Sequence, residues 1–260
     1  MNKIILVLWR IWFYLLTAIP VLVLFPFLAI VLFFPGGYGV VFWIARTIWA
    51  PFVLLGCGFW IKRLNTIPKL TKTSIIIANH TSYLDILVMF RLFKKPFVFV
   101  GKKELVNIPV FGYLYKRAAI MVDRSDQKSR YSVYGFADKV LSKGYSICIF
   151  PERDYLDESI LLNPFKKGAF KMAIEHQLPI IPLVFFDCKR KFPWYTTYGY
   201  PGVLRVKAMP IIAIERKKEN ELQTLISSTH QKMEKALLED EKKAALNAIV
   251  IGNKIKNPLV

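Results

Sequence analysis

The stretch SIIIANHTSYLDIL, residues 74–87, decides how the rest of the sequence is interpreted. A β-branched run of strand length ends before His80, and a pattern typical of a helix follows from Tyr83. Positions five apart do not face each other on a regular helix, so His80 and Asp85 meet only if Asp85 lies in the first helical turn. His80 is then a candidate general base held by the carboxylate. Alternatively, Asp85 is an acid near a helix N-terminus and His80 a capping residue.

Short apolar runs alternate with longer mixed stretches along the rest of the chain. The runs of strand length are residues 74–78, 96–100, 119–122, 146–150, 180–185 and 203–209. The intervening stretches typical of helices are 83–92, 109–117, 128–143 and 164–177. This alternation predicts an α/β fold in which a mostly parallel central sheet is flanked by helices. Sites in such folds are built at the carboxyl ends of the strands.

The first 62 residues differ in composition from the rest of the chain, because they are almost entirely apolar. A spanning helix needs about 20 apolar residues, and Ile11–Phe34 has that length without any charged side chain. A second arm, Tyr38–Ile61, has it only by including Arg46. The turn sequence FPGG separates the two arms, so we expect residues 1–62 to form a membrane-embedded helical hairpin.

The depth of this hairpin stays open at the level of sequence. Pro20 and Pro26 are expected to kink the first arm, and Arg46 is costly at mid-bilayer, so a hairpin that re-enters one leaflet is an alternative to two spans. Basic residues flank the apolar unit on both sides, which predicts that the following domain lies on the cytoplasmic face. A cleaved signal peptide and the buried core of a soluble protein are the alternatives without an embedded hairpin.

Charge and cysteine content narrow the class of partner. The chain has 37 Lys and Arg against 18 Asp and Glu, a formal net charge of +19, with 54% hydrophobic residues. Such a surface attracts phosphate, and the adjacent apolar unit favours an anionic membrane surface over nucleic acid, for which no motif is present. Cys57, Cys148 and Cys188 show no metal-ligand spacing, which predicts reduced structural thiols and no metal site.

Charged side chains also follow three further predicted strands: Lys102 and Lys103, then Arg124, then Glu152 and Arg153. A guanidinium such as that of Arg124 presents a fork of donors suited to phosphate. A surface ion pair is the alternative for Arg124, and a solvated turn with a local ion pair is the alternative for Glu152 and Arg153.

Four blocks follow one another within about residues 60–210. They are NHTSYLD (79–85), KKELVNIPVFG with IMVDR (102–112 and 120–124), FPE with NPFKKGAF (150–152 and 163–170), and LPIIPL (178–183). In order and approximate spacing they resemble the glycerolipid acyltransferase family, typified by bacterial 1-acyl-glycerol-3-phosphate acyltransferases.

The resemblance implies an acyltransferase that moves a fatty acyl group from an acyl thioester to the sn-2 hydroxyl of 1-acyl-glycerol-3-phosphate (lysophosphatidic acid). The product would be phosphatidic acid, in phospholipid biosynthesis. The co-substrate would be acyl-CoA or an acyl carrier protein thioester, and no cofactor or metal is expected. His80 and Asp85 would be the catalytic pair, while Arg124 and the region around Glu152 would bind the glycerol phosphate.

The third block departs from the family pattern. Where the family commonly has Glu-Gly-Thr-Arg, this chain has Glu152-Arg153-Asp154-Tyr155. Arg153 is a candidate to supply the missing guanidinium, and we expect Lys102 and Lys103 to join it at the phosphate. The departure leaves open another lysophospholipid, or an amino-acid-derived lipid, as acceptor.

Residues 63–215 would form the acyltransferase domain, and residues 216–260 an amphipathic docking helix and tail, with the helix over about 218–243. A hydrolase that uses Ser82 as nucleophile is a weaker alternative, because no Gly-x-Ser-x-Gly elbow occurs. From another class, the chain would be a non-catalytic, basic membrane-surface binding protein.

Overall fold

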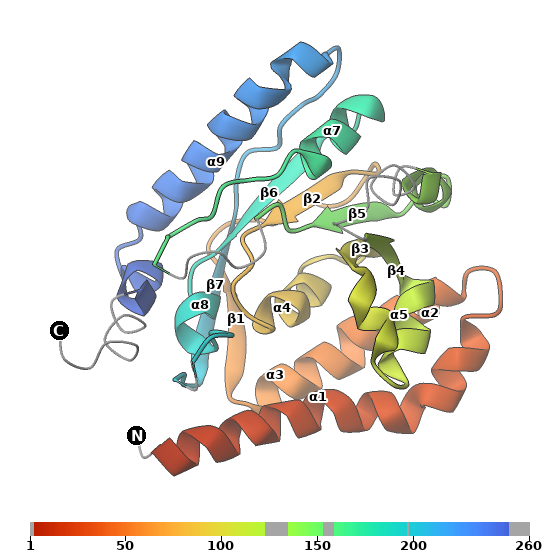
Figure 1. Ribbon diagram of the computed structural model, residues 1–260, viewed down its shortest axis with the longest axis vertical. Coiled ribbons are helices and arrows are strands. Elements are labelled where there is room, and N and C mark those ends of the chain that lie inside the picture. Colours follow the sequence, from red (N-terminus) through yellow and green to blue (C-terminus); the bar gives the residue numbers. More distant parts are fainter. Residues whose placement is uncertain (1–2, 123–134, 153–158, 197, 250–260) are drawn as a thin grey trace.

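The structure is a computed structural model, and it describes residues 3–122, 135–152, 159–196 and 198–249. The described strands form one seven-stranded sheet in the order β1-β7-β6-β2-β5-β3-β4 (Figure 1). Their bounds are β1 Phe59–Arg63, β2 Ile75–Ala78, β3 Phe97–Lys102, β4 Ala119–Val122, β5 Ser146–Ile149, β6 Ile180–Phe185 and β7 Gly202–Ala208. Neighbouring strands are parallel except β6 and β7, which confirms the predicted α/β fold with a mostly parallel sheet.

Helices cover both faces of this sheet (Figure 1). Alternate residues of β2 enter the two layers, since Ile76 packs into the core shared with the N-terminal helices and Ile75 and Ile77 pack into the core beneath α9. The α-helices are α1 Lys3–Val31, α2 Gly37–Ile44, α3 Ala50–Gly56, α4 Leu84–Leu92, α5 Phe111–Ala118, α7 Gly168–Glu175, α8 Cys188–Lys191 and α9 Leu222–Leu238. Short helical turns are η1 Ala45–Trp49, η2 Lys103–Asn107 and η3 Glu219–Glu221.

The predicted helices are found with shifted ends. The tail helix is shorter than its pattern, because α9 ends at Leu238, and residues 164–177 contribute only the two turns of α7. The stretch 128–143 is described only from residue 135, and residues 135–141 are helical.

The apolar N-terminal unit is a pair of helices side by side, as predicted. By length and composition, both Lys3–Val31 and Gly37–Gly56 could cross a membrane, a test that buried core helices and signal sequences also pass. Gly36 adopts φ +81° in the turn between them, and a side chain on Gly37 would meet the Val31 carbonyl oxygen, so both glycines are needed there. α1 continues through its two prolines and bends toward α2 (Figure 1).

The predicted end of the second arm at Ile61 is wrong. The helix ends at Gly56, the chain reverses at Gly58 with φ +74°, and Phe59–Arg63 forms the edge strand β1, parallel to β7. Phe59 is fully buried in the core, which explains why an apolar sequence leaves the helix here and joins the sheet. The predicted domain boundary at residue 62 therefore falls within a strand.

Candidate active site

The structure brings His80 and Asp85 together in the expected way. β2 ends at Ala78 and α4 begins at Leu84, so His80 lies in the connecting loop and Asp85 in the first turn of the helix. His80 Nδ1 and Asp85 Oδ2 are 2.9 Å apart. A buried carboxylate at Nδ1 favours the tautomer with the proton on that atom, which leaves Nε2 as the basic atom of the ring.

Asp85 is held more firmly than a surface acid would be. Its side chain is fully buried, and Oδ2 also accepts hydrogen bonds from the backbone N–H groups of Thr81 at 2.7 Å and Ser82 at 2.8 Å. The carboxylate therefore organises the N-terminus of α4 and orients His80 at the same time. Asp85 thus lies in the first turn of α4, as both interpretations required, but no side chain caps this helix, so His80 is not a capping residue.

Aromatic rings confine the His80 imidazole on two sides. Phe150, which follows β5, stacks on it with ring centroids 3.8 Å apart and an angle of 12° between the planes. Trp194 lies almost perpendicular to it, at 4.5 Å and 87°. The side chain keeps 23% of its surface exposed, so the imidazole is confined and still accessible.

Asn79 fixes the end of β2 to the neighbouring strand. Its Nδ2 donates to the Phe185 carbonyl oxygen at 2.9 Å, and its Oδ1 accepts from the Phe185 N–H at 2.8 Å. This reciprocal pair closes the gap between β2 and β6 just before the histidine. Asn79 thus fixes the position of the backbone immediately before His80.

Glu152 was expected at the phosphate, but its carboxylate binds the protein's own donors. It is 6% exposed, with Oε1 accepting from the His80 N–H at 2.6 Å and Oε2 accepting from the Asn163 N–H at 2.9 Å. Burial raises the pKa of the Glu152 carboxyl, and these hydrogen bonds oppose the rise. A direct contact with a phosphate would add charge repulsion. The geometry instead gives Glu152 the role of holding residues 79–83, the loop between β2 and α4, here called the catalytic loop.

The expected phosphate-binding cations are placed only in part. Lys102 ends β3 and Lys103 begins η2, both exposed, and Lys102 pairs in the sheet with Val122, the last residue of β4. Arg124 and Arg153, like Asp154 and Tyr155, lie outside the described residues. β2, β3, β4 and β5 are parallel, so their carboxyl ends, and the residues that follow them, begin from the same edge of the sheet.

Ser82 does not have the environment of a nucleophile. It is fully buried, and its Oγ donates to the Phe192 carbonyl oxygen at 2.6 Å and accepts from the Leu84 N–H at 3.1 Å. Both hydrogen bonds hold the catalytic loop in place. The geometry therefore opposes the hydrolase alternative.

The three cysteines are free and buried, as predicted for structural thiols. Cys188 has its pKa raised well above the usual range, first by burial and then by the nearby negative charge of Asp85. Deprotonation of this thiol is therefore unfavourable.

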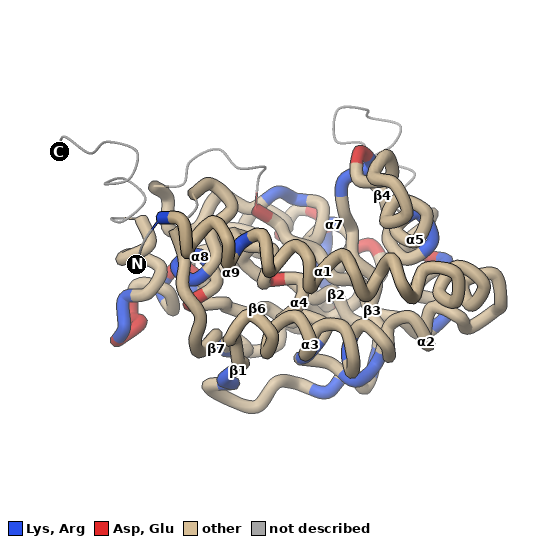
Figure 2. Tube along the Cα trace, turned by 90° about the horizontal axis from the view of Figure 1, so that it is seen from below, with Lys and Arg blue, Asp and Glu red and all other residues tan. Residues whose placement is uncertain are grey.

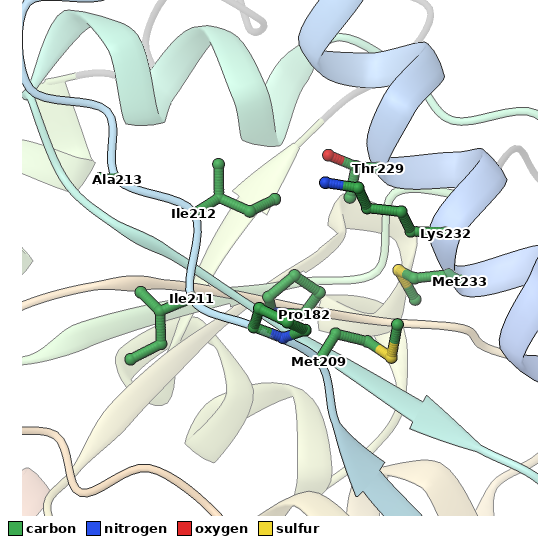
Figure 3. A pocket seen from close by; sticks show the side chains of 9 residues that line it. Pro182, Met209, Ile211, Ile212, Ala213, Thr229, Lys232 and Met233 are labelled. Atoms are coloured by element: carbon green, nitrogen blue, oxygen red, sulfur yellow. The ribbon is translucent and has the colours of Figure 1, made fainter.

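A recess of about 270 Å³ lies away from the predicted site residues, where α9 covers the sheet (Figure 3). Pro182 of β6, Met209 to Ala213 after β7, and Thr229, Lys232 and Met233 of α9 line it. Its lining is mainly apolar, and it contains none of the predicted catalytic or phosphate-binding side chains.

Comparison with known proteins shows which family has this sequence pattern. A model of the Acyltransferase family matches residues 61–186. The chain is 30% identical over 174 residues to the 1-acyl-sn-glycerol-3-phosphate acyltransferase of Escherichia coli, covering 66% of this chain and 70% of that protein. The chain belongs to the glycerolipid acyltransferase family. The resemblance carried by the four sequence blocks is confirmed.

Other acyltransferases match over similar lengths. An uncharacterized acyltransferase of Schizosaccharomyces pombe is 31% identical, covering 65% of this chain and 61% of that protein. The human 1-acyl-sn-glycerol-3-phosphate acyltransferase beta is 26% identical, covering 70% of this chain and 66% of that protein. The chain thus matches less than two thirds of the length of these two relatives.

A solved glycerolipid acyltransferase shares the fold. The crystal structure of the 1-acyl-sn-glycerophosphate acyltransferase from Thermotoga maritima superposes with a TM-score of 0.73 at 19% identity. It covers 92% of this chain, and this chain covers 98% of it. The N-terminal helices, β1 and the sheet are therefore parts of one architecture.

Two groups of contacts were not predicted from the sequence. Trp194 comes from far along the chain, in an aromatic-rich segment whose pattern does not indicate what it packs against. The contacts that Asn79 and Glu152 make with Phe185, His80 and Asn163 also join distant segments. Glu152 was singled out as a charged residue after a predicted strand and Asn79 as part of the first block, but neither pattern predicted these structural contacts.

Proposed function

We propose that the protein transfers a fatty acyl group from an acyl thioester to the sn-2 hydroxyl of 1-acyl-glycerol-3-phosphate, giving phosphatidic acid for phospholipid biosynthesis. The observation that carries the proposal is the 2.9 Å contact between His80 Nδ1 and the buried Asp85 carboxylate, in a His80 side chain that stays 23% exposed. Lys102 and Lys103 follow β3 at the same edge of the sheet. Family members from Escherichia coli and human that match this chain are named 1-acyl-sn-glycerol-3-phosphate acyltransferases.

The geometry supports a direct transfer. A lipid hydroxyl is a weak nucleophile at neutral pH, so His80 Nε2 takes its proton as the oxygen attacks the thioester carbonyl carbon. Asp85 stabilises the imidazolium that forms. When the tetrahedral intermediate collapses, the C–S bond breaks and the thiolate takes the proton from His80. No serine or cysteine of the protein needs to carry the acyl group.

Cations would hold the acceptor by its phosphate. Lys102 and Lys103 belong to the edge from which the catalytic loop starts, and Arg124 and Arg153 are the further candidates from sequence. Holding the phosphate places the sn-2 hydroxyl at the base, which is catalysis by positioning. Acyl-CoA and acyl carrier protein thioesters are the proposed donors, and the proposed chemistry uses no metal or cofactor.

The N-terminal helices support a membrane location. Only 11% of the most apolar window of Lys3–Val31, and 28% of that of Gly37–Gly56, is buried, unlike the core helix of a soluble protein. Figure 2 looks toward this layer, where α1, α2 and α3 carry few charged residues. Exposed apolar side chains of α1 include Ile4, Leu8, Ile11, Leu15, Ile19, Val23, Phe27 and Ile30. We propose that this face binds an anionic membrane surface, with the catalytic domain on the cytoplasmic side.

The packing of α1 favours a hairpin that lies in one leaflet. Near its start, Arg10 contacts Pro193 and Tyr198, and near its end Phe25 packs against Tyr113 of α5. A helix that contacts the catalytic domain at both ends would draw that domain into the hydrocarbon if it stood upright across a bilayer. Lying flat, it presents its apolar face to lipid and keeps the domain in water.

The proposal is tested with the purified protein in phospholipid nanodiscs, crossing two donors with a panel of acceptors. The donors are acyl-CoA and acyl carrier protein thioesters; the acceptors are lysophosphatidic acid, lysophosphatidylcholine, lysophosphatidylethanolamine and an N-acyl amino acid. We expect phosphatidic acid to be the main product and His80→Ala to abolish it. Preference for another acceptor would redirect the proposal to that lipid. Binding to nanodiscs without any transfer would favour the non-catalytic membrane protein.

A further inference from the structure

Residues 192–196, here called the strap, connect the catalytic loop with the N-terminal helix. On the loop side, Ser82 Oγ donates to the Phe192 carbonyl oxygen at 2.6 Å, and Ser82 and Pro193 form an isolated antiparallel bridge. These contacts place Trp194 against the His80 ring at 4.5 Å. The strap therefore forms one wall around the candidate base.

On the other side, the strap is fastened to α1 by Arg10. Arg10 Nη2 donates to the Pro193 carbonyl oxygen at 2.7 Å and to the Tyr198 carbonyl oxygen at 2.9 Å, and the guanidinium lies 4.2 Å from the centre of the Phe192 ring. Arg10 is only 7% exposed, in a helix whose only other charged residue is Lys3. Burying a guanidinium is costly unless its donors are satisfied, so this contact specifies one position of the strap.

Aromatic packing continues the connection between α1 and the strap. The Phe192 ring is fully buried and lies 4.3 Å from Phe13 and 5.4 Å from Trp9, both on α1. Trp194 also packs against Tyr83, which packs against Tyr14 of α1. A continuous set of contacts thus runs from α1 to the histidine.

We propose that Arg10 is a positioning residue for His80, acting through the strap and Trp194. The hydrogen bond that Asp85 Oδ2 accepts fixes the position of His80 Nδ1. It still allows the imidazole ring to rotate about the line from Nδ1 to Oδ2. Phe150 on one face and Trp194 perpendicular to it remove this freedom and fix the direction in which Nε2 points. The catalytic consequence rests on the proposed function; the structural consequence, the orientation of the imidazole, does not.

The test compares Arg10→Met and Trp194→Ala with a matched control, Arg46→Met. Met keeps most of the apolar volume of Arg10 and removes its donors. Arg46 also ties an N-terminal helix to the catalytic domain, because its Nε donates to the Phe93 carbonyl oxygen at 2.8 Å. Phe93 follows the far end of α4, away from His80. Arg10→Lys, which keeps a donor, is the conservative variant.

The first readout is acyl transfer in nanodiscs. A misplaced base costs up to about 100-fold, so we expect Arg10→Met and Trp194→Ala to lower kcat by about 10- to 100-fold, while the acceptor KM changes by less than about twofold. Arg10→Lys should recover part of kcat, and Arg46→Met should stay near wild type. Equal losses in Arg46→Met and Arg10→Met, or a loss confined to KM, would overturn the inference.

The second readout is the NMR resonance of the His80 Cε1–H group, which needs no activity. The chain has only three histidines, so His176→Gln and His230→Gln assign the spectrum. Removing the Trp194 ring current shifts this resonance, and we expect Arg10→Met to shift it in the same direction because the strap moves away. An unshifted resonance in Arg10→Met would refute the positioning role. The expected shifts in a protein without acyl transfer would refute only the proposed reaction.

Discussion

The two halves of the candidate site are built differently. Around the base, Asp85 and Asn79 are buried, and each makes hydrogen bonds to the backbone that fix the loop before α4. On the side expected to bind phosphate, Lys102 and Lys103 stand at exposed positions after β3. Burial makes the first half rigid and sensitive to small changes, whereas exposed charges act through a field that water and salt weaken. Changes on the base side should therefore lower kcat or stability, and changes on the cation side should raise KM.

The largest effect is expected at the catalytic pair. His80→Ala should lower kcat by about 10³- to 10⁴-fold, at the upper end of what a general base contributes, and Asp85→Asn should follow it because the wrong tautomer is favoured. Phosphatidic acid formation from lysophosphatidic acid measures both. The matched control is His176→Gln, since His176 also faces an acid, Asp138, at 3.5 Å but lies after α7. Activity in His80→Ala equal to that of this control would exclude His80 as the base.

The next largest effect is expected at Glu152, which holds the catalytic loop in place without taking part in the reaction. Glu152→Gln keeps an acceptor for the His80 N–H but turns an amide N–H₂ toward the Asn163 donors, which should cost about 1–3 kcal/mol of stability. Melting temperatures in detergent measure this cost, with the exposed Glu239→Gln as control.

The cost of Glu152→Gln should also depend on pH. Burial raises the pKa of the Glu152 carboxyl, so the folded state holds this proton to higher pH than the unfolded chain. The stability that the neutral carboxyl contributes is therefore present at low pH and lost as pH rises through the folded-state pKa. Because Gln does not titrate, the deficit of Glu152→Gln should shrink from acid to neutral pH. A deficit that grows over this range would contradict the raised pKa.

A smaller effect is expected on the cation side. Lys102→Ala and Lys103→Ala should each raise the acceptor KM about two- to fivefold with little change in kcat, as expected for an exposed ion pair. The difference from wild type should shrink as salt is added. Lys235→Ala, on the exposed surface of α9, is the control for the loss of one charge. A fall in kcat at unchanged KM would show that these lysines act in the chemical step at His80 and not in binding the acceptor phosphate.

The smallest effect is expected at the thiols. Burial raises the pKa of Cys148 and Cys188 well above the usual range, so little thiolate is present at pH 8. Iodoacetamide should leave both unmodified and the activity unchanged in the folded protein, while the unfolded chain is alkylated. Mass spectrometry of the two peptides measures this. Rapid alkylation of Cys188 in the active protein would show that the buried region around Cys188 and Asp85 opens to solvent.

Structure set by contacts between near neighbours in the sequence is predictable from it, whereas structure set by distant contacts is not. The strand, loop and helix of residues 74–92 depend on contacts between near neighbours, so the pattern predicts the meeting of His80 and Asp85. Phe59–Arg63 was misassigned because Trp60 and Ile61 continue an apolar run and no local signal marks the reversal at Gly58. Trp194 reaches His80 only through the path of the chain after β6, which a local pattern does not contain.

The outward apolar face of α1 also bears on how the rate of such a protein would be measured. α1 lies beside the catalytic loop, since Tyr14 packs edge-on against Tyr83 at 6.1 Å. With that face in the leaflet, a lipid acceptor would reach His80 by lateral diffusion, without crossing water. Velocity would then follow the mole fraction of acceptor in the bilayer rather than its bulk concentration. Adding inert phospholipid at a constant amount of acceptor would slow turnover by dilution in two dimensions.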